Sequence, residues 1–347
     1  MISKTRIKEI DALRGIAALS VVLFHFNMER STLFNIGCMG VDAFFIISGF
    51  VIFMTIQKVK NWKEFVWSRF SRLYPAYWIC VTITTIAIIL NNHFISTHAS
   101  ADGIVVRYFT NMTMFQYYFS IQNIDNSYWT LIIEIGFYFS MLLLLVKDKI
   151  RYIEKIGYAC LLFCMIYHFD VVCDNYFFHK LLIIFPLIKY FPLFFAGILL
   201  YKMKFEKITA FRLLILVLTL IIQCFIFRNY YNIRFVSINS YILTLIFIYL
   251  IFILYLFNAL QFISNPVTMW LGKISYSLYL IHQFIGIRIV IPYFINDLHC
   301  SFWLSAIIAL IIVLFLAYMI NMTVEIPATK YLRKIYNEKK NLVTAEN

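Results

Sequence analysis

The chain has 347 residues, of which 63% are hydrophobic and only 14% are charged, and its formal net charge is +13. Soluble domains have about 45–50% apolar and about 25% charged residues, so this composition excludes an ordinary soluble enzyme and predicts a polytopic membrane protein. The basic residues are dispersed among short loops, so the charge predicts contact with anionic membrane lipid and no nucleic-acid partner.

Apolar runs close to the length of about 20 residues that crosses a bilayer recur along the whole chain. We expect an all-α bundle of ten transmembrane helices, near residues 12–28, 38–57, 73–90, 128–146, 153–170, 181–201, 208–228, 239–259, 272–293 and 302–323. An even number of spans puts both termini on one side, and most of the 30 Lys and Arg residues fall there, which predicts cytoplasmic termini. The expected organisation is one membrane domain over 1–323 and a short basic cytoplasmic tail over 324–347.

The first span, LRGIAALSVVLFHF, contains Arg14 and, eleven residues later, His25. An ionisable side chain in a membrane helix costs roughly 2.5–3.5 kcal/mol on insertion scales and normally faces a bundle interior. Along a helix the two residues lie about 16 Å apart, with Arg14 near the inner end and His25 in the outer half of the membrane. The pair therefore predicts a functional site.

The second span runs back through GVDAFFIISGF and places Asp42 at about the depth of His25. The Asp42 carboxylate either orients the imidazole as a general base or caps the start of its own helix. Deeper in this span, Ser48 and Gly49 either let two helices approach closely, which is the interpretation we favour, or Ser48 supplies a nucleophilic hydroxyl. The sequence contains no GxSxG elbow.

Two arginines precede the third span in FVWSRFSRLYPAYW, where the spacing of Arg69 and Arg72 places both on one helix face. At the inner membrane surface they could bind a phosphate-bearing ligand from the cytoplasm. They could equally be positive-inside anchors beside the interfacial aromatic residues.

The later spans add three ionisable residues. Glu134 lies about one and a half turns into the fourth span among apolar neighbours, so its side chain must find a partner or remain protonated. Structural pairing with a buried donor is the alternative to a functional role. His282, near the middle of the ninth span, is more simply a structural histidine than a catalytic one, and Glu325 at the inner end of the last span could balance an arginine. No CxxC pair or Cys/His metal spacing occurs, so no metal is expected.

Five motifs together resemble the acyltransferase type 3 family of integral membrane proteins. They are DALRGIAALSVVLFH at 11–25, GVDAFFIISGF at 40–50, RFSRLYPAYW at 69–78, SYWTLIIE at 127–134 and YSLYLIH at 276–282. The resemblance implies a bacterial inner-membrane O-acetyltransferase that moves acetyl from cytoplasmic acetyl-CoA to a hydroxyl of a surface glycan such as O-antigen, capsule or a related polysaccharide. Only residues 324–347 follow the last span, so the fused hydrolase-like domain of some members is not expected.

The resemblance also assigns residues to this reaction. The family's essential arginine and histidine fall on Arg14 and His25, and its RxxR motif falls on Arg69 and Arg72. We expect the acetyl-CoA phosphates to be bound by Arg14, Arg69 and Arg72. We expect the catalytic residues to be His25, Asp42 and Glu134. The secondary candidates are Ser48, His282 and Glu325.

The mechanism is open between two roles for the histidine. His25, oriented by Asp42 or Glu134, either deprotonates a sugar hydroxyl for attack on the thioester or carries the acyl group itself. The alternative from another functional class is a transporter or flippase of a polar or lipid-linked sugar, which buried charges fit equally well. Loss of the thioester in the presence of an acceptor glycan distinguishes the enzyme from the transporter.

Overall fold

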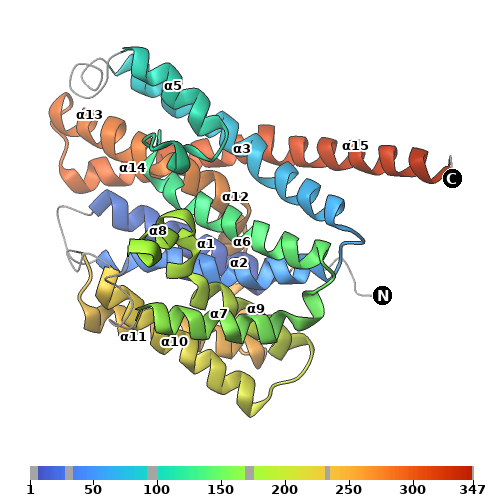
Figure 1. Cartoon of the computed structure of the whole chain (residues 1–347). Helices are drawn as coiled ribbons and strands as arrows, with labels where there is room; N and C mark the ends of the chain where they lie inside the picture. Colours follow the sequence, from blue (N-terminus) through green and yellow to red (C-terminus); the bar gives the residue numbers. More distant parts are fainter. Residues whose placement is uncertain (1–6, 28–33, 92–100, 169–175, 231–234, 346–347) are drawn as a thin grey trace. The chain divides into compact units, whose positions relative to one another are not determined.

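The computed structural model describes residues 7–27, 34–91, 101–168, 176–230 and 235–345 (Figure 1). Across these ranges the regular structure is helical and no strand is formed. Seven of the described helical segments are long and apolar enough to cross a membrane. The protein is therefore an all-α, multi-pass membrane protein, as its composition predicted, while the count of ten spans and the side of the termini stay predictions.

Contacts within the chain define two compact units. Unit 1 comprises Met1–Val59 and Thr130–Gly272, and unit 2 comprises Lys60–Trp129 and Lys273–Asn347. The predicted boundary between a membrane domain and a tail at 323 stays a prediction.

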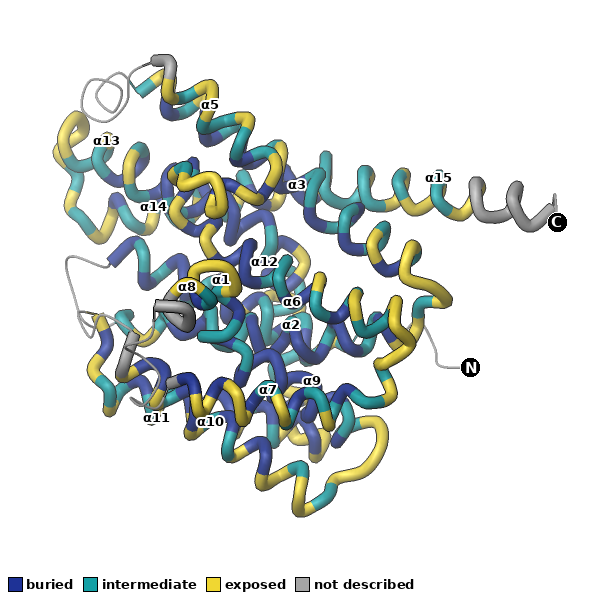
Figure 2. The backbone as a smooth tube through the Cα atoms, in the orientation of Figure 1, coloured by how far each residue is buried: buried dark blue, intermediate teal, exposed yellow. Residues whose placement is uncertain are grey.

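The described residues of unit 1 form eight α-helices and the first turns of a ninth. The helices are α1 (Lys8–Asn27), α2 (Gly40–Ile56), α6 (Trp129–Val146), α7 (Ile153–His168), α8 (Tyr176–Ile184), α9 (Phe191–Phe205), α10 (Ala210–Tyr230), α11 (Ile238–Leu256) and the start of α12 (Pro266–Phe284). Helix α9 is apolar on all sides and buried until its last turn, which carries Lys202 and Lys204 (Figure 2), as expected for the central helix of a bundle.

Helices α2 and α9 lie side by side, and glycines make their close approach possible (Figure 1). A Cβ atom on Gly49 would collide with the Phe194 carbonyl oxygen, and one on Gly197 would collide with that of Ile46. The Ser-Gly pair of α2 therefore does allow two helices to touch through their backbones, which was the favoured interpretation of the sequence.

One predicted span is interrupted. The sequence predicted a continuous helix over 181–201, but α8 ends at Ile184, a 3-10 turn follows over Pro186–Lys189, and α9 starts at Phe191. Pro186 has no N–H to donate and disfavours the helical conformation of the residue before it, and Phe185 accordingly has φ −125° and ψ 74°. Pro192 stands in the first turn of α9, where a missing N–H is tolerated.

Unit 2 contains the remaining helices. They are α3 (Trp62–Leu90), α5 (Ala101–Met112), the rest of α12, a π-helical turn (Ile285–Val290), α13 (Ile291–Asn296), α14 (Phe302–Ile320), a second π-helical turn (Asn321–Glu325) and α15 (Ile326–Ala345). The segment expected to be a tail is thus a helix that continues from α14. At the start of α3 the Asn61 side chain accepts a hydrogen bond from the Glu64 N–H at 2.9 Å, which fixes where that helix begins.

Candidate active site

Arg14 and His25 occupy one face of helix α1. Eleven residues correspond to about three helical turns, so the two side chains project in nearly the same direction. Between them Ala18 and Val21 are completely buried, whereas Ile16, on another face, is 42% exposed. Arg14 and His25 themselves are half-buried. The pair therefore faces the protein interior rather than lipid.

Helix α1 is held rigidly because small residues bring its backbone against its neighbours. A Cβ atom on Gly15 would lie 2.5 Å from the Gly272 nitrogen of α12. One on Gly40, at the start of α2, would lie 2.5 Å from the Ala17 carbonyl oxygen. Backbone contacts of this kind fix the direction in which Arg14 and His25 point.

Glu134 of α6 interacts directly with Ser48 of α2. Its Oε1 atom accepts hydrogen bonds from the Ser48 hydroxyl at 2.8 Å and from the Tyr138 hydroxyl one turn along α6. Its second oxygen has no hydrogen-bond donor within the described part of the chain. The carboxylate is therefore oriented through one oxygen and presents the other, an arrangement that suits a group accepting a hydrogen bond or a proton.

Asp42, in the first turn of α2, has a partner on α11. Its Oδ1 atom accepts a hydrogen bond from the Tyr241 hydroxyl at 3.1 Å. The residue in the N-cap position of this helix is Met39, so Asp42 does not cap it in the usual way, although its charge lies near the positive end of the helix dipole. The Gln223 side chain of α10 is fully buried beside Tyr241.

The two arginines of the RxxR motif lie on α3 in unit 2. Arg69 is only 8% exposed, and its Nε donates to the Ser68 hydroxyl at 3.3 Å. Arg72 is half-buried and follows at the (i, i+3) position. Both belong to one continuous helix, so the predicted common face exists.

Glu325 lies in the second π-helical turn and is bound by neutral groups. Its Oε2 atom accepts hydrogen bonds from the Ser277 hydroxyl at 2.7 Å and from the Asn321 amide at 2.9 Å. Among the described residues it forms no ion pair with an arginine, so the expectation that it balances one is wrong. Two hydrogen bonds satisfy this carboxylate without a cation.

His282 is completely buried on α12. Its Nδ1 donates to the Tyr279 carbonyl oxygen at 2.9 Å, which fixes the tautomer of the neutral ring.

Asp125 accepts hydrogen bonds from two segments of the chain. Two residues after His282, the N–H of Phe284 donates to Asp125 at 2.8 Å, just where the π-helical turn begins. Asp125 also accepts from the N–H and the hydroxyl of Ser127 at 2.8 and 2.7 Å. Burial raises the pKa of Asp125 to about 6, although these three hydrogen bonds oppose the rise.

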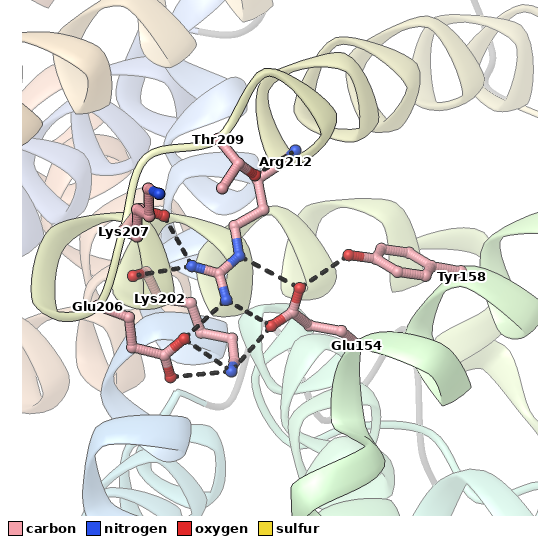
Figure 3. Close-up of polar contacts among 7 residues, drawn as sticks. All are labelled: Glu154, Tyr158, Lys202, Glu206, Lys207, Thr209 and Arg212. Carbon is pink, nitrogen blue, oxygen red and sulfur yellow. Dashed lines mark hydrogen bonds and ion pairs between the residues drawn. The ribbon is translucent and has the colours of Figure 1, made fainter.

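A further polar cluster in unit 1 joins three helices (Figure 3). Lys202 and Arg212 each contact both Glu154 and Glu206 at 2.7–2.8 Å. The Tyr158 hydroxyl also donates to Glu154, at 2.8 Å. The cluster ties α7 and α10 to the end of α9, and we call it the ion-pair network. Sequence reasoning used its lysine and arginine only as topology signals and missed the network.

The candidate residues are divided between the two units. Unit 1 holds Arg14, His25, Asp42, Ser48 and Glu134, and unit 2 holds Arg69, Arg72, His282 and Glu325. Within the described ranges no three His, Cys, Asp or Glu side chains are grouped to hold a metal ion. Sequence reasoning missed Tyr241 and Asp125. A polar residue beside an apolar span was the only available signal for Asp125, and tyrosines are too numerous here for any single one to stand out.

Comparison with known proteins gives a consistent result. A family model described as an acyltransferase domain matches residues 7–322. Peptidoglycan O-acetyltransferase OatA of Listeria monocytogenes is 28% identical over 149 residues, which are 39% of this chain and 24% of that protein. YrhL of Bacillus subtilis, a candidate peptidoglycan O-acetyltransferase, is 26% identical over 142 residues, 37% of this chain and 22% of that protein.

The match to a third relative covers fewer residues. A candidate O-acetyltransferase of Staphylococcus aureus strain COL is 33% identical over 87 residues, 23% of this chain and 14% of that protein. The aligned regions thus span less than a quarter of the length of each of these three relatives. No solved structure matches the chain.

Proposed function

The chain belongs to the acyltransferase type 3 family of membrane proteins, and from this premise we propose that it moves an acetyl group from acetyl-CoA to a hydroxyl of a glycan. The names of these relatives describe O-acetyltransferases, two of them for peptidoglycan. The observation that carries the proposal is the common inward face of Arg14 and His25 on α1. Acyl transfer gives a role to two polar side chains that are costly in a membrane helix.

The proposed chemistry needs a proton acceptor at the glycan hydroxyl. The hydroxyl oxygen attacks the thioester carbonyl carbon, the carbon–sulfur bond breaks, and the hydroxyl proton ends on the departing thiolate. His25 either takes this proton as a general base or accepts the acetyl group before the glycan does. Glu134 and Asp42 are both candidates for orienting the imidazole, because each carboxylate has one oxygen bound by hydroxyl groups and a second oxygen without a donor among the described residues.

For the acetyl-CoA phosphates we propose Arg14, Arg69 and Arg72 as the binding residues. The planar guanidinium group donates two parallel hydrogen bonds to phosphate oxygens, which lysine cannot do. Acetyl-CoA is the only cofactor in this scheme, and the steps require no metal ion.

We place the reaction in the bacterial inner membrane, with both termini in the cytoplasm where acetyl-CoA is available. The acceptor is then a glycan or lipid-linked glycan, with peptidoglycan, O-antigen and capsule as the candidate polymers. Membership of an acyltransferase family favours transfer over the alternative of a transporter or flippase.

Purified protein in lipid nanodiscs tests the proposal. Supplied with acetyl-CoA and muropeptide or capsule fragments as acceptors, it should release free CoA thiol and label the glycan with acetyl. His25→Asn should abolish labelling. His299→Asn is the matched control, because His299 is exposed in a loop with φ 52°, a conformation that asparagine tolerates. Labelling by His25→Asn at the wild-type rate would refute the assignment of His25.

A further inference from the structure

Helix α15 is held along α3 by two hydrogen bonds between side chain and backbone. The indole N–H of Trp67 donates to the Leu332 carbonyl oxygen at 2.8 Å, and the Thr329 hydroxyl donates to the Ser71 carbonyl oxygen at 2.8 Å. The order of these contacts shows that the two helices run antiparallel. The ring of Tyr336 stacks on Trp67 one turn further along α15.

This pairing brings a third arginine to the RxxR motif. Arg72 directly follows Ser71, and Arg333 directly follows Leu332, so each arginine is next to a residue that is hydrogen-bonded to the other helix. Long side chains on a helix lean toward its N-terminus, and in an antiparallel pair the two therefore lean toward each other. Arg72 and Arg333 lie within range of mutual electrostatic repulsion.

Neither guanidinium has a hydrogen bond or an ion pair with any described residue. The acids of neighbouring turns are engaged elsewhere. Glu338 pairs with Lys334 at 3.7 Å, Glu325 is bound by Ser277 and Asn321, and Glu64 accepts from the Lys60 N–H at 3.2 Å. Arg72 is half-buried and Arg333 is exposed, so an anion bound between them would relieve the repulsion of their charges.

We propose that Arg333 and Arg72 together form a phosphate-binding site between α15 and α3. The two planar guanidinium groups come from different helices, so each can bind a different edge of one phosphate group. If the proposed function is right, on which this identification rests, the phosphate belongs to acetyl-CoA, and α15 supplies a binding residue that the RxxR motif does not contain. An anionic lipid headgroup presents the same chemistry.

Binding of CoA to the protein in nanodiscs of neutral phosphatidylcholine tests the first source. Arg333→Gln and Arg72→Gln should each weaken CoA binding about tenfold or more, since each removes a hydrogen bond between two charged groups. Lys334→Gln is the control, because Lys334 belongs to the same helix but its exposed pair with Glu338 contributes little.

A lipid source is tested in nanodiscs containing phosphatidylglycerol. If the site holds a headgroup, Arg333→Gln leaves the CoA dissociation constant unchanged but retains less phosphatidylglycerol in native mass spectrometry. Weaker CoA binding or weaker retention of phosphatidylglycerol by Arg333→Gln supports the phosphate site. Wild-type values of Arg333→Gln in both experiments overturn it. Wild-type protein that binds no CoA would instead refute the proposed function, while the lipid experiment would still decide the site.

Discussion

At the scale of single residues, the best-defined polar arrangement is the Glu134 carboxylate. Two hydroxyls, from Ser48 and Tyr138, hold the same oxygen, so rotation of the carboxylate is restricted and the direction of its other oxygen is set. A proton acceptor that is already oriented loses less entropy when a substrate arrives. Under the proposed function, Ser48 would orient Glu134 in addition to standing beside the helix-packing Gly49.

Substitutions around Glu134 should separate its own role from that of its partners. Glu134→Gln should lower kcat by about 10²-fold or more, the usual contribution of a general acid or base. Ser48→Ala and Tyr138→Phe should lower kcat less, because each removes one orienting bond. Ser140→Ala is the control, since this hydroxyl of α6 donates to the Gly136 carbonyl oxygen of its own helix at 2.9 Å. Wild-type turnover by Glu134→Gln in nanodiscs would exclude a catalytic role.

Residues that break an apolar run were visible from the sequence, and their partners were not. Arg14, His25 and Glu134 stand out because a charge in a membrane span is costly. The contact of Ser48 with Glu134, 86 positions apart, depends on how α2 and α6 meet, and no local pattern encodes that. Arg333 resembled any basic residue after a last span until its neighbour on α3 was known.

At the scale of helices, the crossing of α2 and α9 determines where Ser48 lies. Gly49→Ala should therefore lower the thermal stability of the purified protein, because overpacking a close contact typically costs about 1–3 kcal/mol. Gly136→Ala is the control, since its added methyl group would meet nothing nearer than Leu187 Cβ at 3.9 Å. The melting temperature should fall for Gly49→Ala and stay level or rise for Gly136→Ala. Equal melting temperatures would contradict the close crossing.

The ion-pair network should stabilise the helix ends that it joins. Arg212→Gln should cost about 1–3 kcal/mol, between the values typical of exposed and buried pairs, because the Arg212 and Glu154 side chains are 12% and 22% exposed. Lys334→Gln, which breaks a far more exposed pair, should cost close to nothing. Thermal unfolding in detergent measures the stability of both variants. Equal losses of stability would show that the ion-pair network stabilises the fold no more than an exposed ion pair does.

Asp125 should make stability depend on pH. It directly precedes the span Asn126–Val146, and its pKa is raised from 3.8 to about 6, so the folded protein binds the proton more tightly than the unfolded chain does. The free energy of unfolding should therefore be highest below about pH 4 as far as this group is concerned, fall between about pH 4 and about pH 6, and then level off. Asp125→Asn should remove this slope. If the melting temperature of Asp125→Asn depends on pH as that of the wild-type protein does, another group causes the pH dependence.

The positions of the helices were mostly predictable, and their interruptions were not. Hydropathy located the apolar runs because length and composition alone define a span. It passed over the break between α8 and α9, since Pro186 changes average hydropathy little while removing a hydrogen bond. Hydropathy also missed the continuation of α14 into α15, because α15 is polar. This helix is held on α3 by the hydrogen bonds of Trp67 and Thr329.

At the scale of the whole molecule, composition alone established a multi-pass helical membrane protein, since 63% hydrophobic residues leave no other common class. The division into two units was not predictable. Each unit joins segments far apart in the chain, and such contacts depend on packing rather than on local pattern.

Mass spectrometry of surface glycans tests the proposed acetyl transfer most directly. Cells fed isotope-labelled acetate would be compared with and without the protein, and with His25→Asn and His299→Asn variants at equal abundance. We predict O-acetyl label on a cell-surface glycan only with the wild-type and His299→Asn proteins. Identical labelling of every glycan in all four strains would contradict the account.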